Sequence, residues 1–212
     1  MGKVQRKSSE KMVVYVRYYV CALLLITTNA ISSEQLVSDL PQDKYSYNEP
    51  TISKLKPERV RGRGFKLEFT VDAPLGVFWN YKTNFDNDLL RKNKYITSHK
   101  LVSHKDNLVI TETEYSYKPR DVFNWQTTIY PDQNLLKYEL LNPEECGQKY
   151  HYGYIQLEVD GKSTRVTHVA YFDFFGASFW VNYPFKGGMS DFLDYTARWE
   201  QQFVMEFERK YQ

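Results

Sequence analysis

Cysteine is scarce in this chain of 212 residues, which has only Cys21 and Cys146. The sequence has no Cys-x-x-Cys pair and no His-Glu-x-x-His motif, and its four histidines lack a cysteine or carboxylate at metal-ligand spacing. His99 and His104 are five residues apart, so on a strand their side chains point to opposite faces. We therefore expect no metal site.

Signatures of catalytic nucleophiles and of cofactor binding are absent as well. No Gly-x-Ser-x-Gly elbow is present, and Gly187-Gly188 lacks the following Lys-Ser or Lys-Thr of a phosphate-binding loop. Cys146 lies in an expected loop beside Glu144 and Glu145, whose negative charges disfavour its thiolate. The sequence therefore indicates no nucleophilic enzyme, and we expect no cofactor.

A strong net charge is lacking too, and the small excess is unevenly distributed. The chain has 28 Lys and Arg against 26 Asp and Glu, a net charge of +2. Residues 1–30 contain five of the basic side chains but only one acidic side chain, so the remainder of the chain carries −2. A near-neutral folded region argues against nucleic acid as a partner.

Residues 1–30 are typical of a secretory signal peptide. Their basic segment ends at Arg17, an apolar run reaches Ile26, and Thr28-Asn29-Ala30 offers a small-x-small cleavage site. The apolar run is shorter than the roughly 20 residues of a membrane span. We expect export to a periplasmic or extracellular space after cleavage near Ala30. Membrane anchoring by an uncleaved segment is the alternative.

Residues 31–64 are polar, contain three prolines and show no sustained period, so we interpret them as a linker or an extended arm. The folded domain is expected over 65–212. Its first seven residues alternate between apolar and polar, which predicts a half-buried strand. Asp72 and Pro74 then predict the start of a short helix, with Asp72 as its cap. A second short helix is expected at about 86–92.

Aromatic side chains are abundant, at 17% of the chain, and most of them fit strands. Turn residues such as Asp160-Gly161 separate successive strand patterns, and these short connections predict antiparallel neighbours. The chain closes with one amphipathic helix, which we expect to begin at an N-capping Ser190. The expected strands are 95–104, 107–117, 121–130, 134–141, 150–160 and 163–175, and the helical stripe consists of Phe192, Thr196, Trp199, Phe203 and Phe207.

Three motifs and the order of the elements carry a family resemblance. The motifs are the strand and Ala-Pro run from Phe69 to Trp79, Trp125 in a central strand, and Thr164 to Thr167 after the hairpin. With the closing aromatic helix, they resemble the START-like (SRPBCC) superfamily of lipid-transfer domains and polyketide cyclases. The resemblance implies an α+β helix-grip fold, in which a curved seven-stranded antiparallel sheet surrounds a long C-terminal helix and two short helices follow the first strand.

The resemblance also implies a ligand cavity between sheet and helix, since family members bind lipids, sterols, hormones or polyketides there. The helical residues expected in its roof are Phe192, Thr196, Trp199 and Phe203, and Trp125 is expected from the sheet. The aromatic run at 174–185, with Phe179 and Trp180, predicts a cavity gate or a membrane-contact lip. Packing of this run under the final helix is the alternative.

Glu112 and Glu114 are the candidate polar groups of the cavity. They share one strand face with Leu108 and Ile110, so an inward orientation would bring two carboxylates into an apolar cleft and raise the pKa of one of them. Such a group suits acid–base chemistry of the cyclase or hydrolase type. In the alternative, the opposite face with Tyr115 is the inner one, because charged residues are mostly exposed.

The sequence thus predicts an exported START-like protein that binds a hydrophobic small molecule or lipid. One alternative is an enzyme that uses a cavity carboxylate. Another is a non-catalytic interaction domain whose interior is filled by its own side chains. A fold hosts many functions, so the resemblance does not choose among the three.

Overall fold

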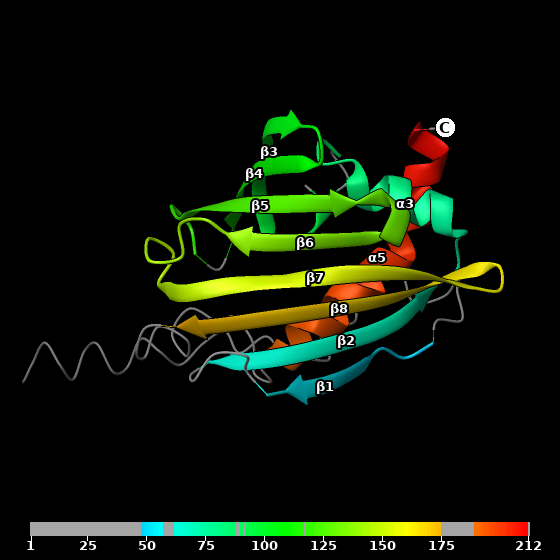
Figure 1. Cartoon of the computed structure of the whole chain (residues 1–212), viewed down its shortest axis with the longest axis horizontal. Coiled ribbons are helices and arrows are strands. Elements are labelled where there is room, and N and C mark those ends of the chain that lie inside the picture. The colour runs from blue at the N-terminus through cyan, green and yellow to red at the C-terminus, as the bar shows by residue number, and fades with distance from the viewer. Residues whose placement is uncertain are drawn as a thin grey trace, which may run out of the picture.

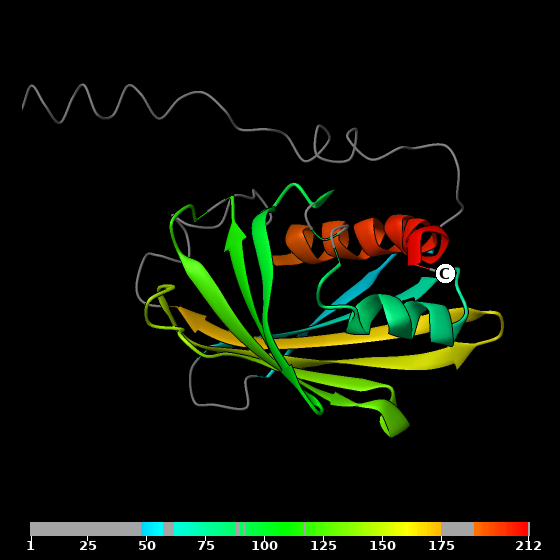
Figure 2. The ribbon, with the colours of Figure 1, turned by 90° about the horizontal axis from the view of Figure 1, so that it is seen from above.

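A curved antiparallel sheet holds a long helix along its concave side (Figures 1 and 2). The computed structural model describes residues 48–56, 62–87, 90, 92–116, 118–174 and 189–211. The leader expected at 1–30 lies outside these residues, as do Phe179 and Trp180 of the aromatic run. No helix in the described part of the chain is long and apolar enough to cross a membrane.

The sheet has eight strands in the order β1-β2-β8-β7-β6-β5-β4-β3, and each neighbouring pair is antiparallel. The chain therefore winds along β3 to β8 by short connections, and β2 then pairs with β8. The strands are β1 Thr51–Leu55, β2 Arg63–Val71, β3 Ile96–Lys105, β4 Leu108–Tyr115, β5 Val122–Tyr130, β6 Leu135–Leu140, β7 Gln148–Asp160 and β8 Ser163–Phe174.

The eighth strand, β1, is the difference from the expected seven-stranded sheet. Thr51–Leu55 falls in the segment that we interpreted as a linker or extended arm, and it pairs antiparallel with β2 at the sheet edge. The strand is only five residues long and its residues are exposed or partly buried, as is common for edge strands. A segment of this kind lacks the apolar alternation by which the inner strands are recognised from sequence.

The helices follow the expected order with small corrections at their starts. Helix α3, Leu75–Thr83, has Pro74 at its N-cap without a side-chain cap, and Asp72 instead accepts a hydrogen bond from Ser163 Oγ at 3.3 Å. Within the expected second helix, Leu90 and Lys92 have 3₁₀ conformation. Helix α5, Met189–Tyr211, begins before Ser190, which therefore lies inside the helix and is not its N-cap.

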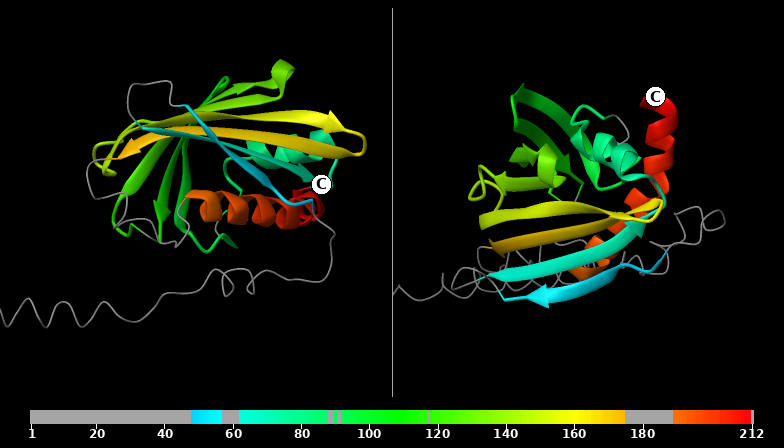
Figure 3. Two further views of the ribbon diagram at one scale, coloured as in Figure 1. Left: turned by 90° about the horizontal axis from the view of Figure 1, so that it is seen from below. Right: turned by 45° about the vertical axis from the view of Figure 1, so that its right-hand side comes forward.

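The core is divided into three clusters of buried side chains. The largest lies where α5 packs against β2, β8 and α3 (Figure 3). Its fully buried members include Leu67, Val71, Phe78, Phe172 and Val204. A second cluster on β4 to β6 consists of Val109, Ile129 and Leu136, and a third consists of Phe123, Leu140 and Cys146.

Candidate ligand-binding site

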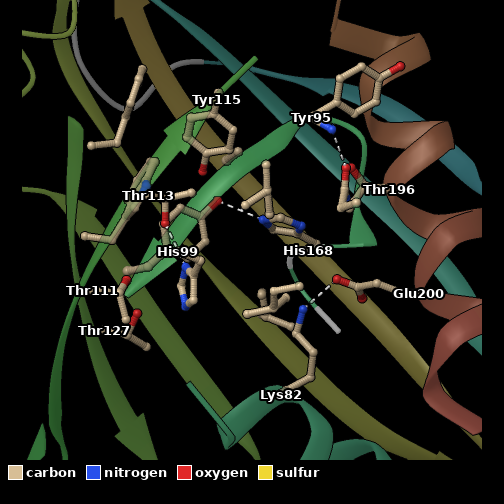
Figure 4. A pocket seen from close by; sticks show the side chains of 18 of the residues that line it. Lys82, Tyr95, His99, Thr111, Thr113, Tyr115, Thr127, His168, Thr196 and Glu200 are labelled. Carbon is tan, nitrogen blue, oxygen red and sulfur yellow. Dashed lines mark hydrogen bonds and ion pairs between the residues drawn. The ribbon is translucent and has the colours of Figure 1, made fainter. Parts of the chain in front are cut away.

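A cavity of about 330 Å³ lies between the inner face of the sheet and helices α3 and α5 (Figure 4). Side chains from all three core clusters line it, among them Leu193, Leu136 and Phe123. The cavity therefore lies between the three core clusters, which would contact one another if the interior were fully packed. Its volume falls within the range of about 300–1,000 Å³ that is usual for small-molecule sites.

Strand β4 turns its odd-numbered residues toward this cavity. Thr111 and Thr113 are buried and line it with Tyr115, and the pairing of β4 with β5 has no register shift. Glu112 and Glu114 lie on the opposite face, and the Glu112 side chain is 40% exposed beside Lys100 at 3.8 Å. The expectation of two cavity carboxylates is therefore wrong. The physical reason is the strict two-residue period set by the fully buried Val109.

Helix α5 supplies the opposite wall. Phe192, Thr196 and Trp199 line the cavity as the helical stripe predicts, and the Thr196 hydroxyl donates to the Phe192 carbonyl at 2.9 Å. Phe203 lies outside the lining. Its ring stacks on Trp199 with centroids 5.0 Å apart and packs against the main core. The stripe thus divides along its length into cavity wall and core.

Trp125 reaches the cavity from β5, as expected, and stands in an aromatic group on the sheet. Its ring lies edge-on to His151, with centroids 4.9 Å apart, and to Tyr138 at 5.8 Å. Burial lowers the pKa of His151 to about 4, so its ring is neutral near pH 7. Aromatic and aliphatic side chains make up most of the remaining lining, including Phe85, Leu90, Ile155 and Ala170.

A hydrogen-bonded pair on the inner face of the sheet, Tyr138 and His168, also lines the cavity. The Tyr138 hydroxyl donates to the Val169 carbonyl at 3.1 Å, and His168 Nε2 is 2.8 Å from the same hydroxyl oxygen. Burial lowers the pKa of His168 to about 3 and raises the pKa of Tyr138, so both groups are neutral near pH 7. Gly153 makes the contact sterically feasible, because a Cβ there would lie 2.5 Å from the Tyr138 oxygen.

His99 is a further polar wall residue. Its Nε2 lies 3.0 Å from the Phe85 carbonyl, and its Nδ1 lies 2.9 Å from Thr113 Oγ1. Since a carbonyl only accepts, Nε2 carries a proton, and in the neutral ring Nδ1 accepts from Thr113. Three histidines thus line the cavity from separate strands, a convergence that sequence spacing did not reveal. No group of side chains suited to a metal ion occurs among the described residues.

One ion pair lines the cavity between the two helices. Lys82 Nζ of α3 lies 2.6 Å from Glu200 Oε1 of α5, and the side chains are only 14% and 10% exposed (Figure 4). Each charge is satisfied by the other in a largely water-free position. The pair was not predictable from the sequence, because its members are 118 residues apart.

Cys146 lines the cavity from the turn before β7 and is 3% exposed. Burial raises the pKa of its thiol to about 11. This protonated thiol agrees with the expectation of an unreactive cysteine, although burial, not the neighbouring glutamates, is the main cause.

Solved structures resemble this chain, whereas no family model and no curated protein matches its sequence. A STAR-related lipid transfer protein from Xanthomonas axonopodis has a TM-score of 0.57 at 11% identity, covering 76% of this chain and 97% of that one. A protein from Thermus thermophilus reaches 0.56 at 8% identity, over 70% and 99% of the two chains. The Zhui aromatase/cyclase from Streptomyces reaches 0.51 at 13% identity, over 72% and 97%.

This is the helix-grip fold of START-like proteins. The fold predicted from the Ala-Pro run and the element order is thereby confirmed, with eight strands in place of seven. Sequence identities of 8 to 13% to these solved structures support the fold but say nothing about an activity.

Proposed function

We propose that this START-like protein binds a hydrophobic small molecule or lipid in the cavity between the sheet and α5. The observation that carries the proposal is the cavity itself, about 330 Å³ in volume and walled mainly by aromatic and aliphatic side chains. Burial of apolar ligand surface supplies the affinity, at about 25 cal/mol for each Å² removed from water. The polar groups on the wall fix the orientation of the ligand.

The alternatives have less support. The interaction-domain alternative assumes an interior filled by its own side chains, whereas a cavity lies between the three core clusters. The cavity-carboxylate enzyme loses its proposed groups, because Glu112 and Glu114 lie on the other face of β4. Of the similar solved structures, one is a lipid transfer protein and one an aromatase/cyclase, and the first agrees with an apolar ligand.

Native mass spectrometry tests this proposal on protein purified from its producing cells without detergent. We expect a mass excess from a bound apolar molecule, which is released into organic solvent on denaturation. Recovery of the unliganded mass alone, together with no binding of added apolar compounds, would contradict the proposal.

We also propose that the protein is exported, on the basis of the signal-like residues 1–30. Mass spectrometry of the mature N-terminus should find a start near Ile31 in the exported fraction. An intact N-terminus in the membrane fraction would favour the anchored alternative instead.

Membrane contact through the aromatic run at 174–185 is a third proposal, which rests on sequence because most of the run lies outside the described residues. Replacement of Phe179 and Trp180 by serine should reduce co-flotation with phosphatidylcholine vesicles. Unchanged co-flotation would contradict a membrane role for this run.

A further inference from the structure

Two buried threonines on the cavity wall have hydroxyls without a hydrogen-bond partner among the described residues. Thr111 of β4 is 5% exposed and Thr127 of β5 is 9% exposed, and both line the cavity side by side (Figure 4). Neither hydroxyl forms a hydrogen bond with any group in the described part of the chain. Both oxygens reach the cavity surface, whereas other unpaired polar atoms of the lining, such as Tyr81 Oη, Trp199 Nε1 and Gln148 Oε1, are enclosed. A ligand in the cavity can therefore bond the two hydroxyls directly.

The other buried threonines of the described residues, Thr113 and Thr164, are paired within the protein, and so is the half-buried Thr196. Thr164 Oγ1 donates to the Ala73 carbonyl at 2.8 Å, Thr196 to Phe192, and Thr113 pairs with His99. Among the buried threonines of the described residues, the unpartnered hydroxyls are confined to this one place on the cavity wall. They lie diagonally across β4 and β5, because Thr111 is opposite Trp125 and Thr127 is two residues further along β5.

The two lysines of the described cavity lining already have carboxylate partners, and two of its histidines are uncharged. Lys82 is bound to Glu200, and the second lysine of the lining, Lys118, is bound to Asp121. Both His151 and His168 are neutral near pH 7, since burial lowers the pKa of each well below 6.5. A ligand carboxylate or phosphate would therefore have to displace an existing ion pair or remain unpaired in an apolar site.

We propose that Thr111 and Thr127 form a subsite for the neutral oxygen group, a hydroxyl or a carbonyl, of an otherwise apolar ligand. A threonine hydroxyl both donates and accepts, so the pair serves an alcohol and a ketone equally. The ligand class is then a neutral apolar alcohol or carbonyl compound, and not a fatty acid or phospholipid. This inference rests on the proposed ligand-binding function and narrows it.

Competition binding on the full chain tests the subsite. The reporter is N-phenylnaphthylamine, a neutral fluorophore without oxygen, and the competitors are decanol and, at about pH 8, ionised decanoate. The variants Thr111→Val and Thr127→Val remove each hydroxyl while nearly preserving side-chain shape. Thr128→Val is the matched control, because Thr128 lies on the same strand outside the cavity lining.

We expect decanol to bind the wild-type protein at least roughly tenfold more tightly than decanoate, because both lysines of the described lining already have carboxylate partners. Each cavity variant should weaken decanol binding about fivefold, the effect of one neutral hydrogen bond. Thr128→Val should leave it unchanged. Reporter affinity should be nearly constant throughout, and Thr111→Ser, which retains a hydroxyl, should restore decanol binding.

The outcomes separate the two proposals. If the reporter binds but both valine variants keep wild-type affinity for decanol, or decanoate binds as tightly as decanol, the subsite is overturned while the cavity function stands. If neither the reporter nor any competitor binds, both are overturned. Thermal unfolding guards against misfolding, and the valine variants should melt at or above the wild-type temperature because the hydroxyls that they lose have no partner among the described residues.

Discussion

Individual histidines show how strongly the interior sets protonation. His151 and His168 are half-buried by surface exposure, yet their rings lie deep enough that burial lowers the pKa values to about 4 and about 3. Neutral rings suit an apolar cavity, because a charged imidazolium there would lack the water that stabilises it. The cost of this arrangement should appear as a pH-dependent stability.

We predict that the free energy of unfolding falls as pH drops from about 6.5 toward 4. The unfolded histidines take up protons below about 6.5 and the folded ones do so only near 4 and 3, so the unfolded state binds more protons in this window. The loss between about pH 7 and pH 5 is about 2 kcal/mol for each histidine. Urea unfolding at a series of pH values measures it.

A variant comparison assigns this loss. His151→Phe should flatten the pH dependence by about half, because the remaining half comes from His168. An identical pH profile in wild-type and His151→Phe proteins would contradict the assignment.

Residue-level features divide into those that the sequence revealed and those that it could not. The alternation of side chains on β4 defines two faces, one with Thr111 and one with Glu112. The sequence did not show which of the two faces the interior. That choice depends on which side the helix occupies. The meeting of His99, His151 and His168 depends on strand order and register, which no local pattern records.

Contacts between elements position the walls of the cavity. Tyr138 of β6 crosses β7 at Gly153 to reach the Val169 carbonyl of β8, so one side chain joins three strands. Between the helices, Lys82 and Glu200 join α3 to α5. Neither contact adds to the apolar core. Both should instead hold the strands and helices that surround the cavity at fixed distances from one another.

We predict that Gly153→Ala destabilises the domain. An added Cβ would lie 2.0 Å from the Val169 carbonyl oxygen and 2.5 Å from the Tyr138 hydroxyl, so the backbone or the tyrosine must move. The expected loss is about 2 kcal/mol or more in unfolding free energy, measured by urea titration.

Gly76→Ala is the matched control for this substitution. A Cβ at Gly76 meets no atom within 4 Å, and the residue lies in α3, where alanine is the better helix former. It should be neutral or stabilise by up to about 1 kcal/mol. Equal effects of the two substitutions would mean that the strand crossing at Gly153 is not tight.

We predict that the Lys82–Glu200 pair is coupled. Lys82→Met leaves a nearly buried carboxylate without its cation, which should cost about 3 kcal/mol of stability. The double variant Lys82→Met/Glu200→Met should be more stable than this single variant, because no unpaired charge remains. Additive losses in the urea unfolding of single and double variants would rule out the coupling.

At the scale of the whole molecule, the order of strands and helices was predictable from the sequence. Each strand or helix has its own spacing of apolar residues, and turn residues separate it from the next. The edge strand β1 was not, since its pairing depends on β2 and not on its own residues. The cavity was not predictable either. Whether aromatic side chains from α5 fill the space or only line it depends on their summed volumes in three dimensions. Phe203, which packs against the main core, and Phe192, which lines the cavity, illustrate both outcomes on one helix.

The central claim, that the space under α5 receives an apolar ligand, is tested most directly by changing that space at one position. Thr196→Phe inserts a ring into the cavity from the helix, whereas Thr196→Ser keeps the hydroxyl that bonds Phe192 and opens the space slightly. Thermal unfolding first establishes that both variants fold.

The measurement is the dissociation constant of N-phenylnaphthylamine from the wild-type protein and these two variants by fluorescence titration. We predict binding to the wild type and to Thr196→Ser with similar affinity, and binding to Thr196→Phe that is roughly tenfold weaker or more, about 1.4 kcal/mol. Equal affinity of a folded Thr196→Phe variant would place the ligand elsewhere and contradict the account.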